Sequence, residues 1–421
     1  MNDSIIEIIG GHPLEGELKL SGAKNAALPL LVTACMADDP ITLENVPIGL
    51  IDVKVMIELL RSTGADILIS GDSTVICKRG NMKGREVIPD LANKIRSSLL
   101  LLGCFAALKQ TVTLPNPGGC NIGERKFDLH LMGLGKLGAV IQANETDIIL
   151  KSDGLEGTTI DFYLPTTTGT ENVMIAACMA KGTTLLRNAN TRPEIQQLGK
   201  LLNLMGAKVK VKNRVVEITG AKQLSGGFNF LVMPGWDEAV SYMAMAGITR
   251  GEVVIKDFDL AHIPEETRYL KNSGLELFQW QNSVYVSGKR LSLPFDLFTA
   301  PYPGVNSDMQ PIFAALALAI PGTSTITDLR FTDRFQYVEE LKHFGANIES
   351  FGNTAIINGG GPLKGARVQA TDLRGGMACV MAGLAAEGRS RISNIYQIER
   401  GYENFVEKLY ALGADICRII E

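Results

Sequence analysis

The sequence predicts an α/β protein that is built from six copies of one unit and divided into two domains. Its length of 421 residues exceeds what one ordinary hydrophobic core serves, so two domains are expected. An apolar helix, followed by glycine and a strand-like run, recurs six times along the chain. A repeat of this size cannot bury a core alone, so several copies must pack together, and six copies divide naturally into two sets of three.

The glycine after each of these helices marks the repeat, because glycine commonly ends a helix in the left-handed backbone region. Successive marker glycines are separated by 74, 68, 68, 71 and 68 residues. Each unit is therefore expected to contain strand, helix, strand, helix and strand within about 70 residues. The markers are Gly64, Gly138, Gly206, Gly274, Gly345 and Gly413.

Two further signals recur with the same period. A strand that ends in an Asn or Asp turn precedes one helix of each unit, at 41–47, 112–119, 183–190, 253–259, 324–330 and 390–396. Another strand is entered through a glycine, at Gly16, Gly84, Gly157, Gly227 and Gly365, and the corresponding strand near Pro294 lacks the glycine. These two signals predict where two of the strands lie in each unit.

The domain boundaries follow from what remains at the two ends of the chain. A strand over Ile5–Leu20 precedes the first helix, and the sixth unit lacks its last strand. The N-terminal strand is therefore expected to complete the C-terminal domain. This predicts one domain over 21–234 and another over 1–20 plus 235–421. The chain would cross between them twice, which predicts a hinge and an active site in the cleft between the domains.

Composition excludes several functional classes. A hydrophobic fraction of 46% and a charged fraction of 20% are those of a soluble globular protein. The net charge of −4 argues against a nucleic-acid partner. The apolar runs are too short for a bilayer span, and no signal peptide opens the chain. Seven cysteines without tight spacing and four scattered histidines predict neither disulfides nor a metal site, so a cytoplasmic location fits best.

One motif has to be set aside. Gly133–Gly138 matches the G-x-G-x-x-G pattern of dinucleotide-binding proteins. That fingerprint must follow a strand and open a helix. Here its last glycine is already one of the repeat markers, so no nicotinamide or flavin cofactor is predicted from it.

The loop over Pro115–His130 is the clearest candidate for chemistry. Proline and glycine interrupt regular structure on the N-terminal side of Cys120, so its thiol is expected on an irregular loop with Arg125 nearby. A buried, inert thiol is the ordinary alternative for a free cysteine. The other six cysteines fit that alternative: Cys35, Cys77, Cys104, Cys178, Cys379 and Cys417.

Two further loops carry a charged residue directly before a helix. Lys24 precedes an apolar helix, where a cation and helix amides together suit an anion, although a solvated lysine would look the same. Asp308 ends a Pro- and Gly-rich loop over Thr299–Gln310. Asp308 or Ser307 could instead merely cap the following helix.

The C-terminal half adds a group of arginines beside acidic residues: Arg334, Asp372 with Arg374, and Glu399 with Arg400. Ion pairs that only support the fold would give the same pattern. Convergent Arg and Lys side chains, however, favour a phosphate or carboxylate ligand. A thiol and a carboxylate beside such a cluster suggest an acid and a base, and the sequence leaves open whether Cys120 acts as acid or nucleophile.

Several motifs together resemble the enolpyruvyl transferases, and among them the branch that acts on UDP-N-acetylglucosamine. The motifs are SGAKNAALPL (21–30), PGGCNIG (117–123), TTTGTEN (166–172), RPEI (192–195), SDMQ (307–310), TDLR (371–374) and ERGYE (399–403). The resemblance covers essentially the whole chain. It implies two inverse α/β barrels of three repeats each.

The resemblance also implies a reaction. The family transfers the enolpyruvyl group of phosphoenolpyruvate to the 3'-hydroxyl of UDP-N-acetylglucosamine and releases phosphate, in the first committed step of peptidoglycan synthesis. By this resemblance Cys120 is the acid that protonates phosphoenolpyruvate and the residue that fosfomycin alkylates. Asp308 is the base that takes the hydroxyl proton. No metal or organic cofactor is implied, and a monomer or weak homo-oligomer is expected.

The remaining assignments carried over from the family concern substrate binding. Lys24, Arg125 and Arg400 resemble the catalytic clamp on phosphoenolpyruvate. The implied substrate contacts are Asn25, Arg96, Arg125, Lys126, Phe127, Asp128, Leu129, Thr166, Thr167, Thr168, Gly169, Arg330, Arg334 and Arg374, beside Lys24 and Asp308.

The chain departs from the family's pattern in four places. Asn116-Pro117 are additional, and the family's Arg-Pro-Val-Asp reads Arg125-Lys126-Phe127-Asp128 here. The family's Asp-Arg-Ile-Glu reads Gly235-Trp236-Asp237-Glu238, and its Pro-Thr-Asp-Met-Gln reads 306–310, Asn-Ser-Asp-Met-Gln. These departures leave open a different acceptor, such as a specialised nucleotide or 3-phosphoshikimate. A non-catalytic ring or clamp of six repeats is the alternative from another class.

Overall fold

The computed structural model describes residues 4–84, 87–117, 126–332 and 334–420. Their chain forms two compact units. The C-terminal unit contains the described residues of 1–21 and of 234–421, and the N-terminal unit contains those of 22–117 and 126–233. In this part of the chain no helix is both long and apolar enough to cross a bilayer.

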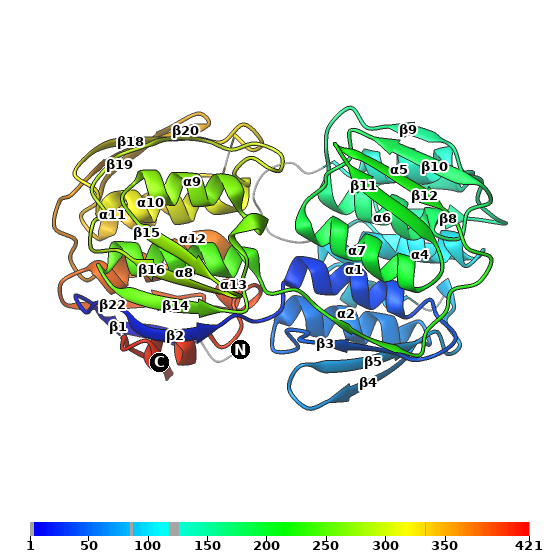
Figure 1. Ribbon diagram of the computed structural model, residues 1–421, viewed down its shortest axis with the longest axis horizontal. Coiled ribbons are helices and arrows are strands. Elements are labelled where there is room, and N and C mark those ends of the chain that lie inside the picture. Colours follow the sequence, from blue (N-terminus) through cyan, green and yellow to red (C-terminus); the bar gives the residue numbers. More distant parts are fainter. Residues whose placement is uncertain (1–3, 85–86, 118–125, 333, 421) are drawn as a thin grey trace. The chain divides into compact units, whose positions relative to one another are not determined.

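The N-terminal unit consists of helices and short strands in regular alternation (Figure 1). Its elements are α1 (Lys24–Ala34), β3 (Ile41–Glu44), α2 (Ile51–Ser62), β4 (Asp66–Ser70), β5 (Thr74–Lys78), α3 (Pro89–Ala92), η2 (Arg96–Leu99), α4 (Leu100–Ala107), β6 (Thr111–Pro115), α5 (Asp128–Lys136), β7 (Val140–Ala143), β8 (Asp147–Lys151), β9 (Thr159–Asp161), α6 (Thr167–Ala177), β10 (Thr183–Arg187), α7 (Pro193–Leu204), β11 (Lys208–Lys212), β12 (Val215–Thr219) and β13 (Phe228–Leu231).

The C-terminal unit repeats the same alternation and also contains the first two strands of the chain. Its elements are β1 (Ser4–Ile9), β2 (Glu15–Lys19), α8 (Trp236–Ile248), β14 (Glu252–Lys256), η3 (Leu260–His262), α9 (Pro264–Asn272), β15 (Glu276–Trp280), β16 (Ser283–Ser287), β17 (Asp296–Phe298), η4 (Ser307–Met309), α10 (Gln310–Leu318), β18 (Gly322–Thr327), α11 (Tyr337–His343), β19 (Asn347–Phe351), β20 (Thr354–Gly359), β21 (Arg367–Gln369), α12 (Leu373–Ala385), β22 (Arg389–Ser393), α13 (Tyr396–Glu399), α14 (Phe405–Ala411) and β23 (Asp415–Ile420).

The repeat is present, with one strand more than the sequence pattern predicted. After the marker glycine the chain forms a hairpin of two antiparallel strands, as in β11–β12 and β19–β20. The second strand of the hairpin pairs with the strand that precedes the second helix of the repeat. That strand pairs in parallel with the first strand of the same repeat, as in the order β17-β18-β20-β19. The pattern missed the second strand in part because turns such as Gln281-Asn282, between β15 and β16, contain neither glycine nor proline.

The predicted glycine turns are confirmed. All six marker glycines have φ between 81° and 106°, a backbone conformation that residues with a Cβ atom rarely adopt. The glycines of the dinucleotide-like motif at 133 and 135 lie inside α5, so that motif does not open a helix and its rejection is confirmed.

Each unit has three inner helices that are mostly apolar and largely buried. These are α1, α4 and α6 in one unit and α8, α10 and α12 in the other, and each set packs together. Every residue of α8 is buried, including the charged Asp237 and Glu238 in its first turn. The two hydrophobic cores share no residue, because one draws on 23–233 and the other on 6–20 and 236–416.

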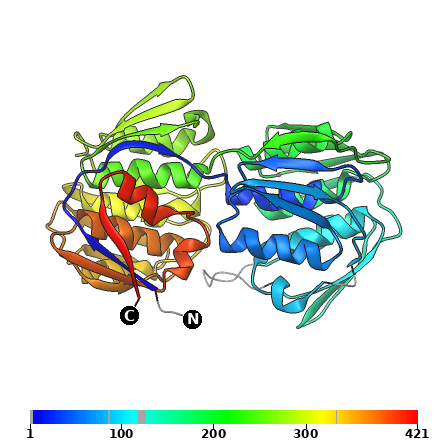
Figure 2. The same ribbon diagram turned by 90° about the horizontal axis from the view of Figure 1, so that it is seen from below.

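The N-terminal segment forms two strands instead of the single strand that was predicted over Ile5–Leu20. β1 lies between β22 and β23, antiparallel to both, so it completes the sheet of the sixth repeat. Figure 2 shows this blue strand among the red and orange C-terminal segments. β2 instead pairs in parallel with β14 and completes the sheet of the fourth repeat. The residues between them, including Gly11 with φ 90°, allow the chain to change sheet.

Within the C-terminal unit, Ser21 at the end of the N-terminal segment is hydrogen-bonded to the segment that begins at Pro234. The Gly235 N–H donates to the Ser21 carbonyl at 2.9 Å, and the Ser21 N–H donates to Glu238 Oε2 at 2.8 Å. Lys408 Nζ donates to Ser21 Oγ at 2.7 Å and pairs with the Glu238 carboxylate. Burial raises the pKa of Glu238, and the Lys408 ammonium opposes that rise.

Candidate functional site

Two of the predicted catalytic residues cannot be placed. Cys120 and Arg125 lie outside the described residues, and their roles stay predictions. The free cysteines of the described part fit the buried alternative in five cases (Cys35, Cys77, Cys104, Cys178 and Cys379), and Cys417 is exposed. Burial raises the pKa of the Cys104 and Cys178 thiols, in the case of Cys178 to about 12, so these thiols stay protonated.

Lys24 is the first residue of α1, and it is not a solvated lysine. Its Nζ lies 3.0 Å from Asp52 Oδ2, and the two side chains are only 12% and 9% exposed. Asp52 comes from the first turn of α2, so a contact between two helices holds the ammonium at the start of α1. Asn25 follows on the same helix and is half-buried. The ammonium is thus positioned and partly neutralised before any anion arrives.

The segment after the cysteine loop meets the start of the second repeat. Arg96, in η2, donates from Nη2 to the Lys126 carbonyl at 3.1 Å. Phe127 is half-buried against the core, and Asp128 begins α5, where its carboxylate accepts a hydrogen bond from the Tyr163 hydroxyl. Leu129 is buried. The structure therefore brings Arg96 to the segment 126–129, as the predicted substrate contacts require.

A buried histidine supports the threonine-rich turn at the start of α6. Asn172 Nδ2 donates to the Leu99 carbonyl at 2.9 Å and to His130 Nδ1 at 3.0 Å, because an amide nitrogen can only donate. His130 Nδ1 is therefore the acceptor, and in the neutral ring Nε2 carries the proton and donates to Thr168 Oγ1 at 3.3 Å. Burial, assisted by the charge of Arg96, lowers the pKa of His130 to about 3, so the ring is neutral.

The turn itself is capped from within. Thr166 Oγ1 accepts from the Gly169 N–H at 3.4 Å, and Thr167 Oγ1 accepts from Asn190 Nδ2 at 3.0 Å. The predicted contact residues Thr166, Thr167, Thr168 and Gly169 thus form one ordered helix start, with hydroxyl groups held by His130 from the preceding repeat and by Asn190 from the same repeat.

A carboxyl group is buried one turn further along α6. Glu171 is 1% exposed, and its Oε1 has no hydrogen-bond partner among the described residues. Burial and then the charge of Glu194 raise the pKa of Glu171 to about 8, against the opposing effect of Arg192. Arg192 pairs with Glu194 at 3.3 Å. Glu171 is therefore largely protonated at neutral pH.

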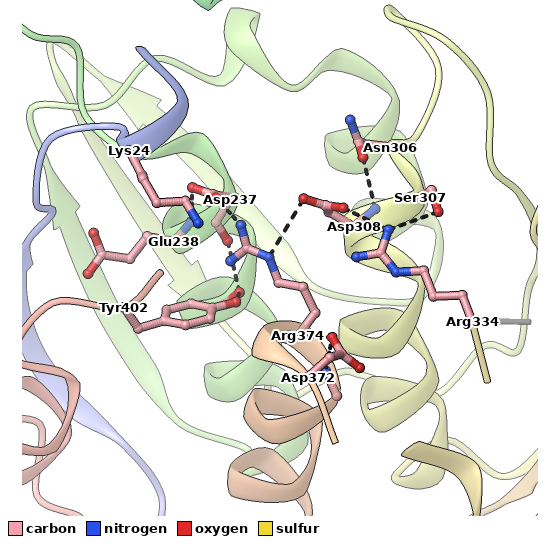
Figure 3. Close-up of polar contacts among 12 residues, drawn as sticks. Lys24, Asp237, Glu238, Asn306, Ser307, Asp308, Arg334, Asp372, Arg374 and Tyr402 are labelled. Atoms are coloured by element: carbon pink, nitrogen blue, oxygen red, sulfur yellow. Dashed lines mark hydrogen bonds and ion pairs between the residues drawn. The ribbon is translucent and has the colours of Figure 1, made fainter. Parts of the chain in front are cut away.

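Asp308 is held by arginine in the C-terminal unit (Figure 3). Arg334 Nη1 lies 2.7 Å from Asp308 Oδ1 and also donates to Ser307 Oγ at 3.1 Å. Asn306 caps the η4 turn by accepting from the Asp308 N–H at 2.8 Å. Neither Ser307 nor Asp308 is an N-cap residue, because Asn306 occupies that position before η4 and Met309 occupies it before α10. The capping alternative for Asp308 is therefore wrong.

Arg374 approaches the same carboxylate from α12. Its Nε lies 4.0 Å from Asp308 Oδ2, and its Nη2 pairs with Asp237 from α8 (Figure 3). The guanidinium carbon lies 4.9 Å from the centre of the Tyr402 ring. Arg374 is only 2% exposed. Its sequence neighbour Asp372 is not its ion-pair partner, since Asp372 caps α12 by accepting from the Arg374 and Gly375 N–H groups.

Both arginines stay charged although they are buried. Burial by itself lowers the pKa of each guanidinium, but nearby carboxylates outweigh it and raise the pKa: chiefly Asp308 for Arg334 and Asp237 for Arg374. Arg374 Nη1 and Arg334 Nε have no hydrogen-bond partner among the described residues. Two buried cations with unused donors flank one carboxylate, an arrangement suited to an anionic reactant beside a base.

The other predicted arginines differ in exposure. Arg400 directly follows α13 and is 7% exposed, whereas Arg330 is exposed and its guanidinium carbon lies 5.8 Å from the centre of the Phe331 ring. Glu399 pairs with Arg418, which separates it from its neighbour Arg400. Among the described residues no three His, Cys, Asp or Glu side chains gather as a metal site would require.

Sequence reasoning missed three partners that organise these groups. Asp52 holds Lys24, Tyr402 stacks on Arg374, and Asp328 accepts from Ser307 beside the base candidate. Asp237 was noticed only as a departure from a pattern. No periodicity marks any of them, since each partner lies in another element and Asp237 and Arg374 are 137 residues apart.

Comparisons with known proteins find similar sequences over nearly the whole chain. The family model described as "EPSP synthase (3-phosphoshikimate 1-carboxyvinyltransferase)" matches residues 8–409. A protein of Carboxydothermus hydrogenoformans named UDP-N-acetylglucosamine 1-carboxyvinyltransferase 1 is 41% identical over 414 residues, which are 98% of this chain and 97% of that protein. A UDP-N-acetylglucosamine 1-carboxyvinyltransferase of Desulforapulum autotrophicum is 42% identical over 416 residues, covering 98% of this chain and 99% of the relative.

Solved structures share the fold. The enolpyruvyl transferase NikO from Streptomyces tendae superposes with a TM-score of 0.89 at 24% identity and covers all of both chains. An EPSP synthase from Acinetobacter baumannii superposes with a TM-score of 0.77 at 20% identity, over 99% of this chain and 100% of its own. At these identities the likeness establishes the two-domain α/β fold alone.

Proposed function

Because the chain belongs to the enolpyruvyl (carboxyvinyl) transferase family, we propose that it transfers the enolpyruvyl group of phosphoenolpyruvate to the 3'-hydroxyl of UDP-N-acetylglucosamine and releases phosphate. The names of relatives at about 40% identity over the full length support this acceptor. The structural observation that carries the proposal is the Asp308 carboxylate flanked by the two buried arginines, Arg334 and Arg374.

In the proposed reaction, Asp308 accepts the proton of the sugar hydroxyl while the hydroxyl oxygen forms a bond to C2 of phosphoenolpyruvate. The Cys120 thiol delivers a proton to C3, and a tetrahedral phospholactoyl adduct forms. Loss of a proton from C3 then expels phosphate and restores the double bond, so atoms and protons balance. A carboxylate at hydrogen-bonding distance from the hydroxyl is the group that the first step needs.

The cations have a separate role. Lys24, Arg125 and Arg400 are proposed to bind the phosphate and carboxylate of phosphoenolpyruvate, and Arg330, Arg334 and Arg374 to contact substrate from the C-terminal unit. The ion pairs of Lys24 with Asp52 and of Arg374 with Asp237 support this, since both cations are held in position. Charge that develops on the reacting oxygens is stabilised most by donors that are already in position.

Recognition of the sugar nucleotide is proposed for the N-terminal unit. Its candidates are Asn25, Arg96, Lys126, Phe127, Asp128, Leu129 and the turn Thr166–Gly169. The support is local order: Arg96 holds the backbone at Lys126, and His130 orients the Thr168 hydroxyl. The predicted location of the site between the two domains stays a prediction. So do a role in cell-wall synthesis in the cytoplasm and a monomeric or weakly associated state.

The test is phosphate release from phosphoenolpyruvate with UDP-N-acetylglucosamine, uridine monophosphate or 3-phosphoshikimate as separate acceptors. Of these three acceptors, only UDP-N-acetylglucosamine is expected to give phosphate release. Folded protein that releases phosphate only with another acceptor, or with none, would contradict the proposal. Asp308→Asn should lower kcat by about 100-fold or more, within the contribution of a general base.

The thiol is tested in the same assay. Cys120→Ala is expected to abolish turnover and also to abolish the mass increase that fosfomycin causes in the unchanged protein. Cys417→Ala is the matched control, because Cys417 is exposed and free yet belongs to no proposed site. Turnover that survives Cys120→Ala unchanged would remove this thiol from the acid role.

A further inference from the structure

Asp237 lies at the isoleucine position of the family's Asp-Arg-Ile-Glu pattern given in the sequence analysis. In the family's Asp-Arg-Ile-Glu stretch the first carboxylate comes two residues earlier, where this chain has Gly235. Asp237 is nevertheless 6% exposed at the start of α8, a place where an isolated charge would be costly. A buried carboxylate in an unusual position needs a partner, and the structure provides one.

That partner is Arg374. The Asp237 Oδ2 pairs with Arg374 Nη2, and Asp237 Oδ1 accepts from the Glu238 N–H at 3.0 Å, so both carboxylate oxygens are engaged. The direction of the guanidinium is thereby set from the α8 side (Figure 3). Its Nε lies 4.0 Å from Asp308 Oδ2 and has no hydrogen-bond partner in the part of the chain that the structure describes.

A second link from α8 reaches the same guanidinium. Ser241 Oγ donates to the Asp237 carbonyl at 2.8 Å, so its single proton is used. The Tyr402 hydroxyl must therefore donate to Ser241 Oγ, at 2.7 Å. This fixes the Tyr402 ring, whose face lies against the Arg374 guanidinium at 4.9 Å. Arg374 is thus held by α8 both at its end and across its face.

The charges around Asp308 show why this matters. Arg334, from the segment after β18, contacts Asp308 directly, and Arg374 reaches it from α12. Asp237 lies behind Arg374, and Asp328 lies behind Ser307. Without Asp237, Arg374 would have an unbalanced positive charge 4.0 Å from the Asp308 carboxylate, and it would draw that carboxylate into an ion pair.

We propose that Asp237 is a positioning residue for the reaction: by pairing with Arg374 it keeps that arginine from forming a second close ion pair with the Asp308 carboxylate, beside that of Arg334, which would make Asp308 a weaker base for the hydroxyl proton. The inference rests on the proposed function and adds a positioning residue to it. Asp237 acts through Arg374 and needs no contact with substrate.

The experiment compares Asp237→Asn and Asp237→Glu with the unchanged protein in the phosphate-release assay, as a pH profile of kcat/KM. Asn keeps the size and loses the charge. Its plateau is expected to fall by about 10-fold or more, and the acid limb to move to lower pH, because a carboxylate beside an unbalanced cation is a weaker base. Glu keeps the charge and should return the acid limb to its original position, even at a lower plateau.

Glu7→Gln is the matched control. Glu7 lies in the same unit on β1 and is a partly buried carboxylate paired with Arg391 at 2.9 Å, but it belongs to no proposed site. Its profile should not move. A merely structural role of Asp237 would lower the plateau without moving the acid limb, and that outcome, or an unchanged profile, would overturn the inference. No phosphate release by the unchanged protein would refute the proposed function instead.

Discussion

At the scale of single residues, the contact between Lys24 and Asp52 can be tested apart from catalysis. Asp52→Asn leaves the ammonium at the start of α1 largely buried without its counter-charge. The free energy of unfolding should fall by about 1–3 kcal/mol, the cost of stranding a buried polar group. Urea unfolding measures it.

Helix α2, which carries Asp52, also offers a matched control. Glu58 on α2 pairs with Arg61 at 2.8 Å, but both side chains are well exposed. Glu58→Gln should change the free energy of unfolding by no more than about 0.5 kcal/mol. Equal effects of the two substitutions would mean that burial of the Lys24 pair contributes nothing.

Glu171 gives a prediction about pH. Its pKa is raised to about 8 in the folded protein, so between its ordinary value and pH 8 the folded state binds the extra proton. The unfolded state then holds fewer protons than the folded state, and stability from this group falls as the pH rises through that window. Glu171→Gln should remove the loss, so its stability relative to the unchanged protein should increase from pH 5 to pH 8 by about 1–3 kcal/mol.

Urea midpoints at pH 5, 6.5 and 8 measure this difference. Glu217→Gln is the control, since Glu217 lies on β12 in the same unit and is much more exposed, with Lys210 at 3.5 Å. A relative stability of Glu171→Gln that does not change with pH would mean that Glu171 is ionised throughout.

At the scale of elements, β1 should be as important as a strand in the middle of a sheet. Ile6 and Ile8 are fully buried, and the strand lies between β22 and β23. Ile8→Ala should cost about 2–4 kcal/mol in the free energy of unfolding, because it removes buried methylene groups and leaves a cavity. Chemical denaturation gives the value.

Ile9 on the same strand serves for comparison. It is 36% exposed, so Ile9→Ala should cost clearly less, about 1 kcal/mol or below. If both substitutions cost the same small amount, β1 would be a frayed end instead of a structural strand.

At the scale of the whole molecule, the two cores are separate, and a local defect should stay in its own unit. The residues of one core all lie in the N-terminal unit and those of the other in the C-terminal unit. Ile8→Ala should therefore speed amide hydrogen exchange in β22, β23 and α12 and leave α4 and α6 unchanged. Mass-spectrometric exchange resolves the two. Equal loss of protection in both units would show that they unfold as one.

Much of the fold was predictable because its signals are local. A marker glycine such as Gly206 and the apolar helix before it lie within a few residues of each other, and the left-handed turn follows from the missing Cβ. The second strand of some hairpins was missed because turns such as Gln281-Asn282, between β15 and β16, contain neither glycine nor proline. The two strands of the N-terminal segment were read as one although Gly10, Gly11 and Pro13 separate them.

The candidate site was predictable as a set of residues and not as a set of contacts. Lys24, Asp308, Arg334 and Arg374 were found from their loops, but their neighbours in sequence proved poor guides to their partners. Arg374 lies two residues from Asp372, yet its ion pair is with Asp237. An acidic neighbour at a helix start is occupied by the backbone amides that it caps.

The sequence by itself determined the number of repeats, the turns between their elements and the loops on which charged residues are concentrated. Only the tertiary structure decided that β2 pairs with β14 in a different sheet from β1, that Asp52 holds Lys24, and that Asp237 rather than Asp372 holds Arg374. The physical reason is the range of the interactions. Backbone conformation depends on neighbours a few residues away, whereas a buried charge pairs with whatever opposite charge the packing of separate repeats brings to it.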